Sequence, residues 1–239
     1  MKTKISLLTI ALFCLFTVNA QLNKPHFISL NVGTSIPLSD YKEVKDQVIS
    51  GGAKNGFSYS IEGAAYLNKF LGIGANIGLF NNGVDNDALL SELEAIDNTI
   101  NKNNSSINTD DWINGYAMVG PYLSFGSEKF VMDLKFLAGL MSTKKPVVNI
   151  NTSSSSATFP TSAEEVVASN IGFNYGLHFR IKIVSKLGLR INAEQFSSQQ
   201  EFKGKIETKD SIGNIVTTEP IIKQQISTFN LGAGLVLTF

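Results

Sequence analysis

The stretch Leu231-Gly-Ala-Gly-Leu-Val-Leu-Thr-Phe239 at the carboxy terminus decides the fold class of this chain. Apolar side chains recur at every second position of this stretch, and glycine, valine and threonine occupy the positions between them. A strand with this period of two presents one continuous apolar face and one face of small or polar residues. In a membrane, that pattern is typical of a barrel strand with its apolar side in lipid. The stretch therefore predicts a transmembrane β-strand.

Seven further segments of the chain show the same alternation of apolar and polar residues. They are Phe27 to Ile36, Phe57 to Leu67, Leu71 to Leu79, about Ile113 to Phe125, Phe130 to Met141, about Asn170 to Lys182 and Leu187 to Glu194, which with the terminal strand makes eight. About ten residues at roughly 3.3 Å each, tilted near 45°, span about 23 Å, which is close to the apolar band of an outer membrane. Each segment is therefore long enough to cross that band.

The connections between the segments alternate in length. Asn68-Lys69, Gly126 to Lys129 and Val184 to Lys186 are tight turns, whereas residues 37–56, 81–112, 142–169 and 197–226 form long polar stretches. Short periplasmic turns and long extracellular loops are the rule in single-chain outer-membrane barrels. We therefore expect an all-β fold, an eight-stranded antiparallel up-and-down transmembrane β-barrel with both termini in the periplasm. A barrel of this size is filled by its own side chains.

Two of the long loops carry signs of further structure. From Asn86 onward, Leu89, Leu93, Ile96 and Ile100 recur at helical spacing and predict one short amphipathic helix. This helix either covers the barrel mouth as a lid or docks an external partner. Alternation from Phe202 onward predicts that the last hairpin extends beyond the membrane, with Asp210 to Asn214 as its turn.

The amino terminus has the three parts of an export signal. Lys2 and Lys4 precede an apolar run from Ile5 to Val18, and Val18-Asn19-Ala20 supplies small residues before Gln21. We therefore expect residues 1–20 to be a cleaved signal peptide and residues 21–239 to be the barrel domain, exported to the cell outer membrane. The single cysteine, Cys14, follows Phe13, where a lipoprotein signal needs a small residue, so no lipid anchor is expected.

The charge of the mature chain argues against nucleic acid as a partner. The full chain has 20 Lys and Arg against 20 Asp and Glu, and cleavage after Ala20 removes two lysines, which leaves a net charge of about −2. Outer-membrane lipid is the expected surrounding, and the long loops could bind an extracellular partner. Nothing in the sequence marks an oligomer interface, so a monomer is expected.

At this point the pattern resembles a known group, the small outer-membrane β-barrel domain proteins of the Bacteroidetes type, often labelled porin-like. The terminal strand ending in Phe239, the stretch Gly115-Tyr-Ala-Met-Val-Gly-Pro-Tyr-Leu-Ser-Phe125 and the run Gly72-Ile-Gly-Ala-Asn-Ile-Gly78 carry the resemblance. It covers nearly the whole mature chain and implies the barrel fold without implying a ligand. It also implies that the barrel-insertion machinery recognises the terminal signal, which comprises Leu235, Leu237 and Phe239.

Charged side chains occupy only the inward faces of the predicted strands. With the adjacent histidine they are Glu62, Asp133, Lys135, His178, Arg180, Lys182, Arg190 and Glu194. Because Arg or Lys facing lipid at the midplane costs about 2–4 kcal/mol, this partition supports the assigned faces. Pairing of consecutive strands would place Asp133 near His178 and Arg180, and Arg180 opposite Arg190. These residues are expected to form a salt-bridge network that fills the barrel or, alternatively, to line or gate a narrow pore.

Other kinds of site find little support. The glycines of Gly72-x-Gly74-x-x-x-Gly78 lie within a strand at the wrong spacing for a nucleotide loop. His26 and His178 are the only histidines, and neither has Cys or a clustered carboxylate at metal-ligand spacing, so no metal and no cofactor are expected. His178 would lie too deep for a catalytic site at the external rim, so no enzymatic activity is expected.

The sequence thus favours an integral outer-membrane barrel with a structural or surface-interaction role. A narrow porin-type channel for small solutes is the first alternative. A secreted, soluble, lipocalin-like barrel that binds an apolar ligand is the second, and it would require the apolar faces to point inward.

Overall fold

The computed structural model describes residues 25–44, 51–96, 105–127, 129–152, 166–203, 206–209, 215–218 and 221–239. The expected signal peptide and the expected turn from Asp210 to Asn214 lie outside these residues. Within them, eight strands close into one antiparallel barrel, in the order β1-β12-β9-β8-β6-β5-β3-β2. The predicted fold class is confirmed.

The barrel strands run further than the sequence segments indicated. Their bounds are β1 Phe27–Pro37, β2 Ala53–Tyr66, β3 Leu71–Val84, β5 Trp112–Gly126, β6 Phe130–Lys145, β8 Val166–Lys182, β9 Leu187–Lys203 and β12 Ile221–Thr238. Apart from Gly126 of β5, the added length lies at the end with the long connections. There β9 and β12 remain paired as far as Lys203 and Ile221, which confirms the extended last hairpin.

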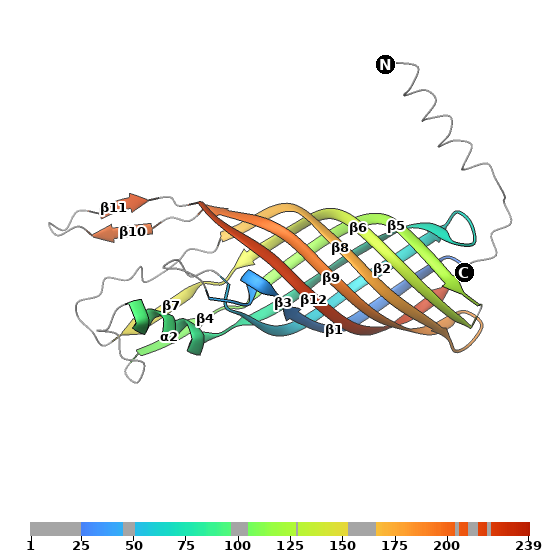
Figure 1. Ribbon diagram of the computed structural model, residues 1–239, viewed down its shortest axis with the longest axis horizontal. Coiled ribbons are helices and arrows are strands. Elements are labelled where there is room, and N and C mark those ends of the chain that lie inside the picture. The colour runs from blue at the N-terminus through green and yellow to red at the C-terminus, as the bar shows by residue number, and fades with distance from the viewer. Residues whose placement is uncertain are drawn as a thin grey trace, which may run out of the picture.

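Several smaller elements lie outside the barrel. They are the 3-10 helix η1 Ser39–Tyr41, the helix α2 Asn86–Ile96, the paired strands β4 Ser105–Thr109 and β7 Val148–Thr152, and the hairpin β10 Ile206–Lys209 with β11 Ile215–Thr218. Figure 1 shows α2, β4, β7 and this hairpin at one end of the barrel, and the carboxy terminus at the other. None of the helices in the described ranges is long and apolar enough to cross a membrane.

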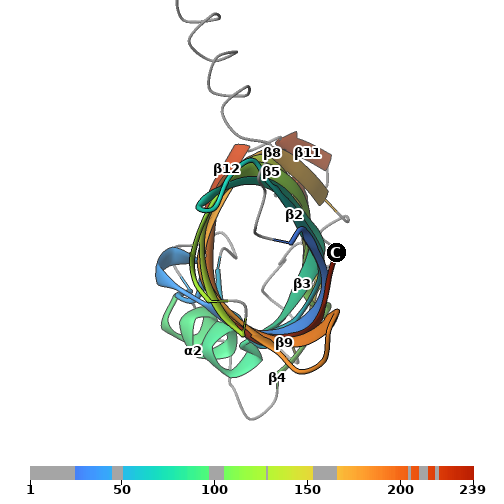
Figure 2. The same ribbon diagram turned by 90° about the vertical axis from the view of Figure 1, so that its right-hand side faces the viewer.

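The predicted helix is present, but it does not cover the barrel mouth. Leu89 and Leu90 of α2 pack with Ile107 and Val148, which belong to the β4–β7 pair. Figure 2 shows α2 to one side of the ring of strands. The lid interpretation was wrong because the apolar face of the helix finds its partner in the small β4–β7 sheet. Ile100, the last residue of the predicted helical pattern, lies outside the described residues.

The faces of the strands follow the predicted alternation. Large apolar side chains point outward along every barrel strand, and Leu30, Val32, Ile77 and Ile171 are each 61–62% exposed. Polar and aromatic side chains fill the inside. A soluble protein rarely exposes so continuous an apolar surface. A lipocalin-like barrel has the opposite arrangement, so the soluble alternative is excluded.

Glycines on β3 make room for aromatic side chains inside this narrow barrel. A Cβ atom on Gly74 would collide with the ring of Tyr122, and one on Gly78 would lie 2.6 Å from the hydroxyl of Tyr116. Both tyrosines are buried. The glycine run thus serves packing, as its position inside a strand indicated. A glycine of another kind is Gly126, whose φ of 113° allows the tight turn between β5 and β6.

Candidate functional site: the charged barrel interior

Seven of the eight predicted interior residues meet inside the barrel. Glu62, Asp133, Lys135, His178, Arg180, Arg190 and Glu194 are all buried, and we call these seven residues the charge cluster. The cluster holds three carboxylates, three Lys or Arg side chains and one histidine. Lys182 is the exception, because it lies exposed at the end of β8 that carries the short turns.

Glu62 forms the centre of the charge cluster. Its Oε2 atom accepts a 2.8 Å hydrogen bond from Lys135 Nζ, and its Oε1 atom accepts hydrogen bonds from Arg190 and from the hydroxyl of Tyr122. These donors come from β6, β9 and β5, whereas Glu62 is on β2. The carboxylate therefore joins walls of the barrel that are not neighbours in the sheet.

Glu194 completes the surroundings of Lys135. Its Oε1 atom lies 3.1 Å from Lys135 Nζ and 3.0 Å from His178 Nε2. The amide of Asn174 donates a 3.3 Å hydrogen bond to the other oxygen of Glu194. Lys135 thus has a carboxylate on each side, which is the arrangement that makes a buried ammonium group tolerable.

A second ion pair lies nearer the short-turn end. Arg180 donates from Nε to Asp133 Oδ2 at 2.6 Å and from NH2 to Asp133 Oδ1 at 2.9 Å, so the pair is bidentate. Tyr66 and Ser124 also donate to Asp133, and Arg180 donates to the hydroxyl of Tyr66 at 2.7 Å. Bidentate contacts between guanidinium and carboxylate are among the stronger polar interactions in proteins.

The two arginines are held apart by an aromatic ring. Arg180 lies 4.4 Å and Arg190 lies 4.6 Å from the centroid of the Phe27 ring. The strand register sets Arg180 directly opposite Arg190, as the sequence predicted. Phe27 therefore offers a π face to each guanidinium where a like-charge contact would otherwise form.

The pairing of β6 with β8 was predicted from the sequence, whereas several side chains that contact the charge cluster were not. Asp133 is directly opposite His178 in the register. Sequence reasoning missed the tyrosines, the serines and Phe27 as partners of the charges. Alternation along Phe57 to Leu67 puts Tyr66 on the same inward face as Glu62, and alternation along Ile113 to Phe125 puts Tyr122 inward, next to the outward Leu123.

His178 lies beside two glutamates, whereas the sequence predicted no carboxylate cluster at metal-ligand spacing from a histidine. Ligand atoms of Glu62, His178 and Glu194 lie within 4.8 Å of one another, so that expectation was wrong. The three residues come from β2, β8 and β9, and barrel closure brings them together. Lys135 and Arg190 already neutralise both carboxylates. A divalent cation there would add charge to a site whose formal charges balance.

An aromatic layer fills the barrel between the charge cluster and the long loops. It contains Phe80, Trp112, Tyr116, Phe196 and Phe202, all buried. Their rings pack in two groups. The centroids of Phe80, Tyr116 and Phe196 lie 4.6–6.2 Å apart, and those of Trp112 and Phe202 lie 6.1 Å apart. These contacts are typical of interlocked aromatic packing.

The side chain of Tyr41 closes this layer from the loop side. It extends from η1 to the ring of Trp112, with centroids 5.4 Å apart, and donates a 3.3 Å hydrogen bond to Asn82. Its hydroxyl also accepts a 3.1 Å hydrogen bond from Asn114. Burial raises the pKa of Tyr41 well above its ordinary value, so the phenol keeps its proton. No pattern in the sequence indicates that a residue of the first long loop lies inside the barrel.

Comparisons with known proteins bear on the fold alone. No family model matches the chain, and no curated protein matches it. Solved structures similar to it include the attachment invasion locus protein Ail of Yersinia pestis (12% identity, 89% of this chain and 99% of that chain covered, TM-score 0.44). They also include Neisserial surface protein A (11% identity, 90% of this chain and 97% of that chain covered, TM-score 0.45). A third is the outer membrane protease OmpT of Escherichia coli (8% identity, 93% of this chain and 99% of that chain covered, TM-score 0.44). At such identities the likeness carries no conclusion about activity.

Proposed function

We propose that this protein is an integral outer-membrane β-barrel with a non-enzymatic, structural or surface-interaction role and a closed interior. Two features of the barrel together support this proposal. Its outer face is apolar, as contact with lipid requires, and its interior is filled by side chains in two successive layers. The charge cluster and the aromatic layer together occupy the cross-section with buried side chains. The outward apolar residues match the lipid-facing band of such barrels.

Aromatic residues near the strand ends agree with a membrane location. Phe57, Tyr59, Phe130 and Phe239 face outward with exposed side chains. Aromatic side chains favour the boundary between lipid and water. We assign the short turns to the periplasm and the long connections to the outside, as the loop lengths favour.

If the interior is closed, the protein contacts other molecules through the long connections at its extracellular end. The connections 38–52, 85–111, 146–165 and 204–220 carry 15 Asp or Glu residues against five lysines in the sequence. A partner with a positively charged surface would suit this end. We also propose that the barrel-insertion machinery recognises the terminal signal formed by Leu235, Leu237 and Phe239.

Conductance of the refolded protein in a planar bilayer tests the closed interior. Gel migration that changes on heating would first establish that the barrel is folded. The expected result is a silent bilayer from folded protein. Discrete openings would instead favour the narrow porin-type channel, and the proposal of a closed interior would fail.

Asp133→Ala separates a structural plug from a gate. This change leaves Arg180 without its bidentate carboxylate, so a plug loses stability while the bilayer stays silent. A gate would conduct once the pair is broken. Lys223→Ala is the matched control, because Lys223 and its partner Glu201 are 62% and 52% exposed on the outer hairpin.

A further inference from the structure

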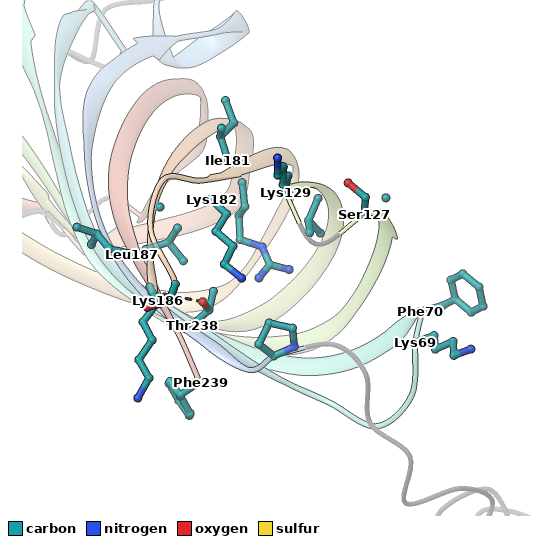
Figure 3. Close-up of a pocket in the computed structure, with 17 residues that line it drawn as sticks. Lys69, Phe70, Ser127, Lys129, Ile181, Lys182, Lys186, Leu187, Thr238 and Phe239 are labelled. Carbon is teal, nitrogen blue, oxygen red and sulfur yellow. Dashed lines mark hydrogen bonds between the residues drawn. The ribbon is translucent and has the colours of Figure 1, made fainter.

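The short-turn end of the barrel opens into a pocket whose charged lining is largely basic. Its volume is about 720 Å³, and its lining includes Lys69, Lys129, Arg180, Lys182 and Lys186. Figure 3 shows the four lysines around the opening, with Lys182 extending into it. We call this pocket the basic vestibule. Its volume is in the range of ligand-binding pockets, roughly 300–1,000 Å³.

The lysines of the basic vestibule have no acidic partners within the described chain. No Asp or Glu among the described residues forms an ion pair with Lys69, Lys129, Lys182 or Lys186. The terminal carboxylate of Phe239 is the anionic group of the described lining, and Glu128, adjacent to Lys129 in sequence, lies outside the described residues. The three carboxylates of the charge cluster are matched by its three Lys or Arg side chains, so the cluster has no surplus carboxylate to compensate these lysines.

Lys182 occupies a special position among them. By strand alternation it faces inward, two residues beyond Arg180 on β8. Arg180 is compensated by Asp133, whereas Lys182 lies exposed below the last carboxylate of the cluster.

The chemistry of the lining indicates the class of ligand. Lysine ammonium groups bind phosphate as mobile point charges, and a phosphate group offers several acceptor oxygens to several donors at once. Val131, Leu187 and Val236 add an apolar wall beside the cations. We propose that the basic vestibule binds a phosphate-bearing anion, with Lys182 as its central contact and Lys129 and Lys186 as rim contacts.

This chemistry is shared by soluble phosphates and by phospholipid headgroups of the adjoining leaflet. Binding itself does not depend on the closed interior, since the vestibule lies beyond the charge cluster. Only the assignment of the vestibule to the periplasm rests on the proposed function. A conducting barrel would therefore refute the proposed function and leave this inference standing.

Equilibrium dialysis of inorganic pyrophosphate against the refolded protein in phosphatidylcholine nanodiscs tests the proposal. We expect saturable binding that weakens at least tenfold in Lys182→Met and falls with added salt. Lys223→Met is the matched control, because it removes a lysine from the other end of the molecule, and it should bind as the wild type does. Lys182 is exposed and makes no side-chain ion pair within the described chain, so folding should survive its replacement.

A second arm distinguishes the two sources of phosphate. Nanodiscs that contain phosphatidylglycerol should displace pyrophosphate in a Lys182-dependent manner if the vestibule takes a lipid headgroup. Unchanged pyrophosphate affinity in those nanodiscs would assign the vestibule to soluble phosphates. Equal binding by wild type and Lys182→Met, or no saturable binding in either kind of nanodisc, would overturn the proposal.

Discussion

Replacement of Glu62 by glutamine is the sharpest test of the charge cluster. The change keeps the shape of the side chain and removes the carboxylate that contacts both Lys135 and Arg190. Lys135 keeps Glu194 at 3.1 Å, whereas Arg190 loses its only carboxylate contact among the described ion pairs. The loss of stability should therefore come mainly from a stranded, fully buried guanidinium.

The expected loss is about 3–5 kcal/mol, the usual consequence of removing one partner from a buried ion pair. An independent estimate agrees, because two unit charges 4 Å apart attract by about 4 kcal/mol at an effective dielectric constant near 20. Arg190 keeps the hydrogen bond that it donates to the Ser29 hydroxyl and its contact with the ring of Phe27, and both hold the loss toward the lower end of this range.

Urea unfolding in lipid vesicles measures the effect, with fluorescence of Trp112 as the signal. The chain has one tryptophan, and it is 1% exposed inside the aromatic layer, so its emission reports loss of the folded interior. Glu201→Gln is the matched control. It breaks the exposed ion pair with Lys223, for which a loss of about 0–1 kcal/mol is expected.

The double variant Glu62→Gln with Arg190→Met completes the test. Removal of both charges should restore more than half of the stability that Glu62→Gln loses, because no charge is then stranded. A loss below about 1 kcal/mol in Glu62→Gln, equal to that of the surface control, would refute the view that the cluster supports the barrel.

Three further changes test other parts of the structure. Tyr41→Ala should lower stability by about 3–5 kcal/mol in urea unfolding, as for a buried aromatic residue, yet leave the bilayer silent because the charge cluster remains. Gly74→Val should abolish the heat-modifiable gel band, since its side chain would collide with Tyr122. Burial acts to raise the pKa of Asp85, but a backbone N–H of α2 and the Lys54 ammonium hold it below its ordinary value. The stability that Asp85 contributes is therefore present above its unfolded-state pKa and lost as pH falls through the lower folded-state pKa. Amide hydrogen exchange measured at decreasing pH should therefore show α2 opening before the barrel strands do. Asp85→Asn should abolish this pH dependence of α2 opening. If α2 opening did not change with pH in either protein, this assignment would be contradicted.

The sequence predicted the strands and their faces because the period of two is a local property. Leu30 faces out and Glu62 faces in for reasons that four or five neighbouring residues settle. The register that sets Asp133 opposite His178 and Arg180 opposite Arg190 was also predictable, since each pair joins consecutive strands of the barrel across one turn or loop.

Contacts across the lumen could not be predicted in the same way. Glu62 lies on β2 and meets Arg190 of β9 only because the sheet closes through the pairing of β1 with β12. Strand tilt and stagger set which levels then coincide, and both depend on the whole barrel. Tyr41 was missed for a related reason, since a loop residue has no alternation to mark it as buried.

The distribution of charge along the barrel links these observations. The cluster contains as many carboxylates as Lys and Arg side chains, so each buried charge has a partner and the lumen is electrically balanced. A conducting pore would need an open cross-section and a lining with an excess of positive or negative charge. The reason is that an ion must exchange its hydration water for protein groups that are not already paired. Here the lysines of the basic vestibule, which form no ion pair among the described residues, lie outside the filled section, and the acidic excess lies in the long connections. Under the two proposals, the interior stabilises the barrel and recognition falls to its two ends.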